Sequence, residues 1–338
     1  MTDTETSGPG RDVEAASPDQ PTELPPRAWR TALRRTVGEV FEDELPDKAA
    51  TLTYYGVLSL FPTLLMLISL VGAAGESAVR RALDTVRELA PGPAREILTT
   101  AVEELQRSSG TSKFIAVISM MAALWAASAY VGAFIRASNV VYDIPEGRPL
   151  WKVTPLRVGL TVVLVLLLAC STLIVVFTGP LARRAGEAAG IGDGVMAVWA
   201  IAKWPVLGLL VVLMLALLYW AAPNAKVRGF RWLSPGSGLA VLLWLAASAG
   251  FALYLANFNT YNQTYGSMAG VVIFLLWVWL TNLAILIGLE FDSELARQRA
   301  VAGGLPEEEE PYVRPRDTRS WPRRLRERRK AGSRGQEK

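Results

Sequence analysis

The chemistry open to this chain depends on a few polar residues that stand inside long apolar segments. One of them, Asn282, falls near the middle of the last such segment. Four others fall within the first: Tyr54, Tyr55, Ser59 and Pro62. Polar groups in hydrocarbon are costly and usually face a cavity or a hydrogen-bonding partner. We therefore expect these residues either to line a polar cavity or to join helices, and both interpretations stay open.

Most kinds of enzyme are excluded by what the sequence lacks. The chain has no histidine, which removes histidine metal sites, Ser-His-Asp triads and Cys-His dyads. The single cysteine, Cys170, stands in the middle of an apolar segment, where a small hydrophobic role fits better than a nucleophilic one. No nucleotide-binding glycine motif is found. We therefore predict a protein that is not an enzyme, with no catalytic residue, no metal site and no cofactor.

The elements that position these residues are six apolar segments. Roughly 20 helical residues, at about 1.5 Å each, cross the hydrocarbon core of a bilayer. With 51% hydrophobic residues, the chain of 338 residues supplies six segments of that kind. They run over residues 50–74, 114–137, 156–178, 204–222, 238–256 and 270–289. The predicted fold class is an all-α integral membrane protein, a bundle of six transmembrane helices.

The loop charges predict the orientation, because basic residues stay on the cytoplasmic side. The approach to the first segment, the second connection and the fourth connection are rich in arginine and lysine, and so is the tail after the sixth. The fifth connection has none. Both termini are therefore predicted to be cytoplasmic.

Five residues are expected to share one depth at the cytoplasmic boundary. Arg136 and Asn139 end the second segment, Glu290 follows the sixth, and Tyr54 and Tyr55 begin the first. Partial burial makes an isolated charge expensive, so we expect Arg136 to pair with Glu290 in a polar inner mouth built from three helices. An anionic cargo would compete for the arginine there. A simpler alternative is an interfacial arginine that extends toward the headgroups.

Deeper in the membrane, Pro62 interrupts an otherwise continuous helix. Proline leaves the carbonyl of Leu58 without its helical partner, which predicts a kink in the first span. The kink either opens a polar cavity or is closed by Ser59 as a packing feature. Asn282 likewise either faces a cavity or joins two helices.

On the outer side, residues 76–110 carry two apolar stripes separated by Pro-Gly-Pro, which predicts two short amphipathic helices. The uncharged loop 257–269 predicts a hairpin between the fifth and sixth spans. Tyr261 and Tyr265 suit an interfacial aromatic belt, and Gly266 permits the turn. An ordinary interfacial turn is the alternative.

The two ends of the chain are polar and predicted to be disordered. Residues 1–26 form the N-terminal tail, residues 27–300 the membrane domain, and residues 301–338 a polybasic C-terminal tail. Basic residues near an anionic leaflet contribute on the order of 1 kcal/mol each, so the tail is expected to adhere to membrane lipids. Nucleic acid is not an expected partner, because no aromatic platform accompanies the charge.

Four stretches, in order, resemble successive motifs of one family: LTYYGVLSLFPTLL, IRASNVVYDIPEGRP, YWAAPNAKVRGFRWLSPGS and YNQTYGSMAGVVIFLLWVWLTNLAILIGLEFDSEL. They are similar to the YihY/BrkB family of bacterial inner-membrane proteins, over about residues 30–300. The resemblance implies a six-helix protein of the bacterial cytoplasmic membrane with both termini inside. Members of that family carry labels as different as ribonuclease and serum-resistance virulence factor.

Two functions are compatible with these residues. The first is a transporter or flippase-like carrier for an amphipathic anionic envelope molecule, suggested by the bent first helix, Asn282 and the charges at one mouth. The second is a membrane organiser that transports nothing and binds other envelope proteins. A hydrolase of the ribonuclease kind fits poorly, because such enzymes need metal ligands in an aqueous cleft. The sequence specifies neither a cargo, an energy source nor an oligomeric state.

Overall fold

The computed structural model describes residues 16–73, 113–176, 193–227, 234–257, 268–307 and 309–323. Regular structure in these ranges is helical, apart from an isolated β-bridge between Ala225 and Pro315. The elements are the 3-10 helix η1 (Pro21–Glu23) and the helices α2 (Pro26–Glu42), α3 (Leu45–Ala73), α6 (Lys113–Val141), α7 (Leu150–Val176), α9 (Asp193–Ala221), α10 (Ser234–Asn257) and α12 (Met268–Ala302). The prediction of an all-α protein is confirmed for these ranges.

Six long helices occupy the six predicted segments. Four are long and apolar enough to cross a membrane, by length and composition: Leu150–Val175, Ile201–Ala221, Pro235–Tyr254 and Gly270–Ala302. The helices α3 and α6, of 29 residues each, hold the first two predicted spans. The count of six spans stays a prediction. Since α7 begins at Leu150, before the predicted segment, Arg157 lies within the helix and not at its start.

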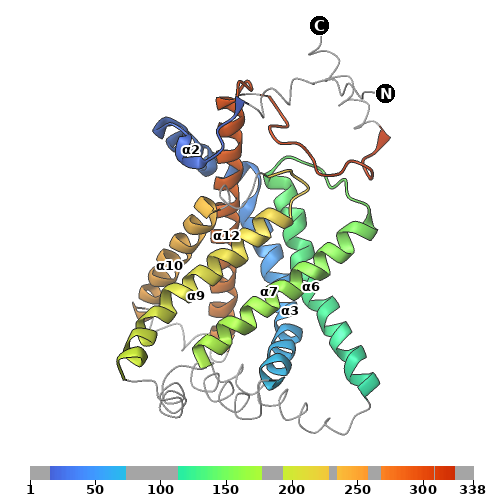
Figure 1. The fold of residues 1–338 in the computed structure, drawn as a ribbon, viewed down its shortest axis with the longest axis vertical. Coiled ribbons are helices and arrows are strands. Elements are labelled where there is room, and N and C mark those ends of the chain that lie inside the picture. The colour runs from blue at the N-terminus through green and yellow to red at the C-terminus, as the bar shows by residue number, and fades with distance from the viewer. Residues whose placement is uncertain are drawn as a thin grey trace.

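The long helices alternate in direction, so α3, α7 and α10 begin at the end of the bundle where α6, α9 and α12 finish (Figure 1). We call this the inner end, because the loop charges predict it to be cytoplasmic, and the opposite end the outer end. At the inner end α6 and α9 touch, and Phe134 stacks on Tyr219 with ring centroids 6.3 Å apart. Toward the outer end these two helices diverge (Figure 1).

Most of the buried core lies in the inner half of the bundle, apart from Ala127 of α6 and Val165 and Ala169 of α7, which lie farther out. Among the described side chains of α9, the first buried one is Leu215, and in α12 the first is Asn282. Outward of these positions the same helices expose large apolar side chains such as Val198, Ile201 and Leu276. Hydrocarbon or other apolar surfaces must cover them in a membrane. The tight packing that can fix side-chain positions is therefore found at the inner end.

Two glycines bring α10 and α12 into backbone contact. A β-carbon on Gly236 would collide with the carbonyl oxygen of Gly288, and one on Gly288 would meet the side chains of Ala240 and Tyr219. Small residues permit such close approach between helices in lipid. The amide of Gly236 also donates to Asp292 Oδ1 at 2.7 Å, which ties the start of α10 to α12.

The C-terminal segment 309–323 packs across the inner end, whereas the sequence predicts disorder there. We call it the strap. Its backbone pairs with the loop after α9, with Lys226 N donating to Arg314 O at 2.7 Å. Trp321 is buried and donates its indole N–H to Pro145 O at 3.0 Å. The prediction of a disordered tail is thus wrong for this segment, because charge composition does not reveal that two loops supply partners for its polar and aromatic groups.

The N-terminal segment is also docked where the structure describes it. Leu24 is buried beside α2 and α12, and Arg299 donates to Pro18 O at 2.8 Å. The predicted disorder is therefore wrong for residues 16–26. Residues 1–15 and 324–338, the two outer amphipathic helices and the hairpin residues Tyr261, Tyr265 and Gly266 lie outside the described residues.

Candidate functional site

Two arginines and three aromatic residues come together where α3, α6 and α7 meet. The Arg136 Cζ atom lies 5.5 Å from the centre of the Tyr55 ring, and Arg157 Cζ lies 4.5 Å from that of Trp125. Tyr54 packs edge-on against Tyr55, with ring centroids 5.3 Å apart. Aromatic faces attract cations, so the rings support both guanidinium groups. We call these five residues the arginine patch.

The guanidinium groups of the patch are close to each other and have no acidic partner in the part of the chain that the structure describes. Both reach within 4 Å of the point where a β-carbon on Gly132 would stand. Neither Arg136 nor Arg157 forms an ion pair with any carboxylate of the described residues. The Arg157 Nε atom is buried without a hydrogen-bond acceptor in that part of the chain. Like charges at this spacing repel, and an anion bound between them would offset the repulsion.

Sequence reasoning placed Tyr54, Tyr55 and Arg136 together, and the structure does so too. It does not join Arg136 to Glu290, so the predicted ion pair is wrong. The two residues lie at one end of the bundle, but their side chains point to different neighbours. Depth along a helix fixes one coordinate only, and the rotation of α6 and α12 about their axes decides the partner.

Glu290 instead lies beside another acid. Its side chain is 2% exposed and its Oε1 accepts a hydrogen bond from Ser293 at 3.1 Å. The carboxyl group of Asp43, in the turn between α2 and α3, lies near enough to interact electrostatically with it. Two carboxyl groups at close range disfavour each other's ionised form. Burial raises the pKa of Asp43 to about 6, and the nearby carboxylates of Asp143 and Glu39 push it the same way.

Asn139 belongs to a buried structural contact and not to an open mouth. Its Nδ2 donates to Glu146 Oε2 at 3.0 Å, and its Oδ1 accepts the backbone N–H of Asn224 at 2.7 Å. Asn224 in turn accepts the amide of Asp317 in the strap at 3.1 Å. This asparagine therefore helps to hold two loops and the strap together at the inner end.

Asn282, which the sequence predicts near the middle of its span, joins three helices. Its Oδ1 accepts a hydrogen bond from the Tyr130 hydroxyl of α6 at 2.8 Å. Its Nδ2 donates to Thr53 Oγ1 of α3 at 3.2 Å, and the Thr53 hydroxyl donates to Ala49 O at 2.8 Å. The side chain is 3% exposed. We call this contact the Asn282 link, and it marks the outward limit of the buried core on α12.

The other two mid-membrane candidates lie in α3. The Ser59 side chain is buried and donates to Gly56 O at 3.0 Å, so its hydroxyl is satisfied within its own helix. Pro62 lies inside α3, which continues to Ala73. The proline therefore does not end the helix, and its part in a cavity stays a proposal.

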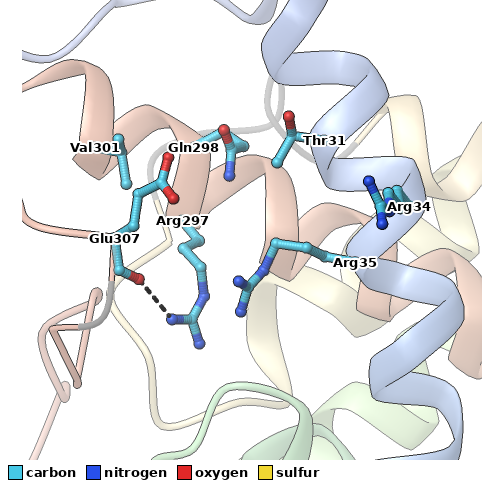
Figure 2. A pocket seen from close by; sticks show the side chains of 7 residues that line it. All are labelled: Thr31, Arg34, Arg35, Arg297, Gln298, Val301 and Glu307. Atoms are coloured by element: carbon cyan, nitrogen blue, oxygen red, sulfur yellow. Dashed lines mark hydrogen bonds between the residues drawn. The ribbon is translucent and has the colours of Figure 1, made fainter.

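A cavity of about 310 Å³ lies at the inner end between α2 and α12, lined by Thr31, Arg34, Arg35, Arg297, Gln298, Val301 and Glu307 (Figure 2). Arg35 pairs with Glu294 at 2.8 Å, and Arg297 with Glu310 at 2.9 Å. These acids neutralise most of the positive charge around the cavity. An external anion would have to compete with carboxylates already in place, so the arginine patch is the better anion site.

Three residues in these contacts are not among the site candidates that the sequence predicts. Arg157 falls at the start of the predicted segment 156–178, and an arginine so close to an apolar run can lie within a helix. Tyr130 stands in the middle of an apolar segment, and a buried tyrosine hydroxyl normally finds a partner, which is a usable signal. Trp125 carries no signal beyond its aromatic type. Within the described ranges no three residues of the types His, Cys, Asp or Glu are grouped to hold a metal ion.

Comparison with known proteins gives consistent matches over most of the chain. A family model described as virulence factor BrkB matches residues 36–312. The chain is 30% identical to the ribonuclease-like protein YfkH of Bacillus subtilis, over 79% of this chain and 94% of that protein. It is 28% identical to a UPF0761 membrane protein of Xanthomonas oryzae pv. oryzae, over 80% of this chain, and 30% identical to one of Alkalilimnicola ehrlichii, over 78%.

The matches cover 64% of the Xanthomonas relative and 58% of the Alkalilimnicola relative, so this chain spans about three fifths of their length. No solved structure matches the chain.

Proposed function

Since the chain belongs to the BrkB family of membrane proteins, we propose that it is a multi-pass protein of the bacterial cytoplasmic membrane that carries an amphipathic anionic envelope molecule across the bilayer. The arginine patch carries this proposal. Two guanidinium groups that pair with no carboxylate among the described residues are complementary to a phosphate or carboxylate head. Trp125 and Met121 are exposed one turn apart on α6, and their apolar surfaces suit the hydrocarbon part of such a molecule.

The distribution of packing supports a carrier that is closed at its inner end. The buried core, the Asn282 link and the strap all lie toward that end, whereas α6 and α9 diverge toward the outer end (Figure 1). Alternating access moves one group of helices against another around a fixed site. In this proposal, opening of the inner end separates helices that the Asn282 link now joins.

The test is lipid movement in liposomes that contain the purified protein. A fluorescent analogue of phosphatidylglycerol is followed between leaflets by quenching with dithionite, beside a neutral phosphatidylcholine analogue and a small fluorescent anion. We expect protein-dependent movement of the anionic lipid. Arg136→Gln and Arg157→Gln should each slow it about 10-fold or more, because a charge-assisted hydrogen bond contributes roughly 1.5–3 kcal/mol.

Lys203→Gln is the matched control. Lys203 also lies over an aromatic ring, with its Nζ 5.3 Å from the centre of the Trp204 ring, but in the part of α9 outward of the buried core. Removing that charge should leave the rate unchanged. Equal slowing by all three substitutions would point to net charge instead of a site. Folded protein that moves none of the three probes would refute a carrier of this kind.

The alternative is an organiser that binds other envelope proteins and transports nothing. It is favoured by one observation: the Asn282 side chain is used in hydrogen bonds between helices, as a structural link would be. In that case liposomes that contain the wild-type protein should show no movement of any probe between leaflets. Crosslinking from the exposed outer positions, such as Ile201 and Leu209, should then capture envelope proteins in cells.

A further inference from the structure

The helix α2 has two apolar faces, and the protein covers only one of them. Ala28, Ala32 and Thr36 are buried on the covered face, where Trp29 packs against Phe291 of α12 with ring centroids 6.1 Å apart. On the second face Leu33, Val37 and Phe41 are 50%, 61% and 74% exposed. A spacing of four residues places these three on a single strip along the helix. We call them the α2 strip.

The position of α2 brings the strip to the membrane surface. A turn of two residues, Asp43 and Glu44, separates α2 from α3, and Glu44 has a positive φ of 51°, so the chain changes direction between the two helices. Within two helical turns of its start, α3 enters the predicted first span. Figure 1 shows α2 lying across the inner end beside α12, outside the central helices. An apolar strip there lies near the level at which α3 enters hydrocarbon.

The flank beside the strip carries only positive charge. Arg27, Arg30 and Arg34 are exposed and lie three and four residues apart, so they share one side of α2. Of the acids on this helix, Glu39 is paired with Arg35 at 3.2 Å, and Glu42 lies about 80° around the helix from Arg34. A helix with an apolar strip bordered by arginines is typical of one that lies in the interface of an anionic leaflet.

We propose that α2 lies in the headgroup layer of the leaflet at the inner end, with the α2 strip in the acyl chains and Arg27, Arg30 and Arg34 on lipid phosphates. Three side chains are far fewer than the 20–30 residues a side of a stable protein interface, so a lipid surface fits the strip better than a second copy. The proposal needs no cargo and does not depend on transport. It adds a lipid contact separate from the arginine patch.

The experiment uses the full chain in bilayer discs made of phosphatidylcholine and phosphatidylglycerol, after Cys170→Ser removes the natural cysteine. A spin label is placed on Val37→Cys and, as matched control, on Gly38→Cys. The control site is adjacent, lies about 100° around the helix, and has no atom within 4 Å of its β-carbon position. Collisions with oxygen, which enters lipid, are compared with those of a water-soluble nickel chelate.

The label at position 37 should collide mainly with oxygen and the label at 38 mainly with the chelate. Equal access of the chelate to both would place the strip in water and overturn the proposal. A label at 37 that is shielded from both reagents would assign the strip to a protein neighbour, which also overturns it. Leu33→Cys provides a second reporter on the strip if the first variant does not fold.

The headgroup contact is tested with a fluorophore at position 37 and quenchers attached to either lipid. The anionic quencher should be preferred about fivefold or more, and replacing Arg27, Arg30 and Arg34 by glutamine should bring the ratio near one. An unchanged preference in the triple variant would refute the role of the three arginines.

Discussion

Asn282→Leu is expected to loosen the inner half of the bundle by a measurable amount. The substitution keeps the number and branching of the side-chain heavy atoms and removes two hydrogen bonds between helices, one from the Tyr130 hydroxyl and one to Thr53 Oγ1. Such bonds in membrane proteins contribute about 0.6 kcal/mol on average and up to about 1.7 kcal/mol. Tyr130 also loses the acceptor for its hydroxyl, whereas Thr53 still donates to Ala49 O. The expected loss of unfolding free energy is about 1–3 kcal/mol.

A double-mutant cycle isolates the bond between Tyr130 and Asn282. Unfolding is followed by tryptophan fluorescence as a denaturing detergent is added to the protein in lipid–detergent micelles. Tyr130→Phe alone should cost about 1 kcal/mol. The double variant should be no less stable than Asn282→Leu, because the orphaned hydroxyl is then gone. The coupling energy of the pair should be about 1 kcal/mol.

Thr281→Val is the matched control in the same helix. Its hydroxyl donates to Trp277 O at 2.9 Å within α12, so its loss should cost less than about 0.5 kcal/mol. If the effects of Asn282→Leu and Tyr130→Phe simply add, the two side chains are not coupled. The Asn282 link would then not hold α6 against α12, and the account of a closed inner end would lose its main support.

Two more predictions concern the inner end. Asp43 has a pKa near 6 in the folded protein against an ordinary value of 3.8, so the folded state binds the extra proton and the unfolding free energy falls as pH rises between these values. Asp43→Asn should remove that fall and be more stable at pH 7 by on the order of 1–2 kcal/mol, measured by thermal unfolding from pH 4 to 8; parallel curves for the two proteins would contradict the shift. Gly147→Ala should displace the strap, because a β-carbon there collides with the backbone of Asp317, and trypsin should then cut at the strap arginines about 10-fold faster. Gly159→Ala, which has open space, is its control, and equal cleavage of both variants would show that the strap tolerates the methyl group.

Membrane segments could be predicted because their cause is local. A run of roughly 20 apolar residues excludes water along its whole length, whatever surrounds it. The helices α7, α9, α10 and α12 follow from that property alone. The grouping of Arg136 with Tyr54 and Tyr55 could also be predicted, because all three residues lie at the same depth near the inner ends of their helices. Their long side chains can then bridge several ångströms.

The partners of those residues were decided by the tertiary structure. Whether Arg136 faces Glu290 or Arg157 depends on the rotation of α6 against α7 and α12, which packing between helices sets. The strap illustrates the same limit, because its composition resembles a solvated tail until two loops present acceptors for Trp321 and Arg316.

The sequence by itself therefore determined the helical membrane class and the level of each polar residue along its helix. The tertiary structure decided which polar groups meet, whether a charge is neutralised, and which apolar faces remain uncovered. The physical reason is that hydrophobic burial depends on each segment's own composition, whereas a hydrogen bond or an ion pair needs two groups within a few ångströms and in the right direction.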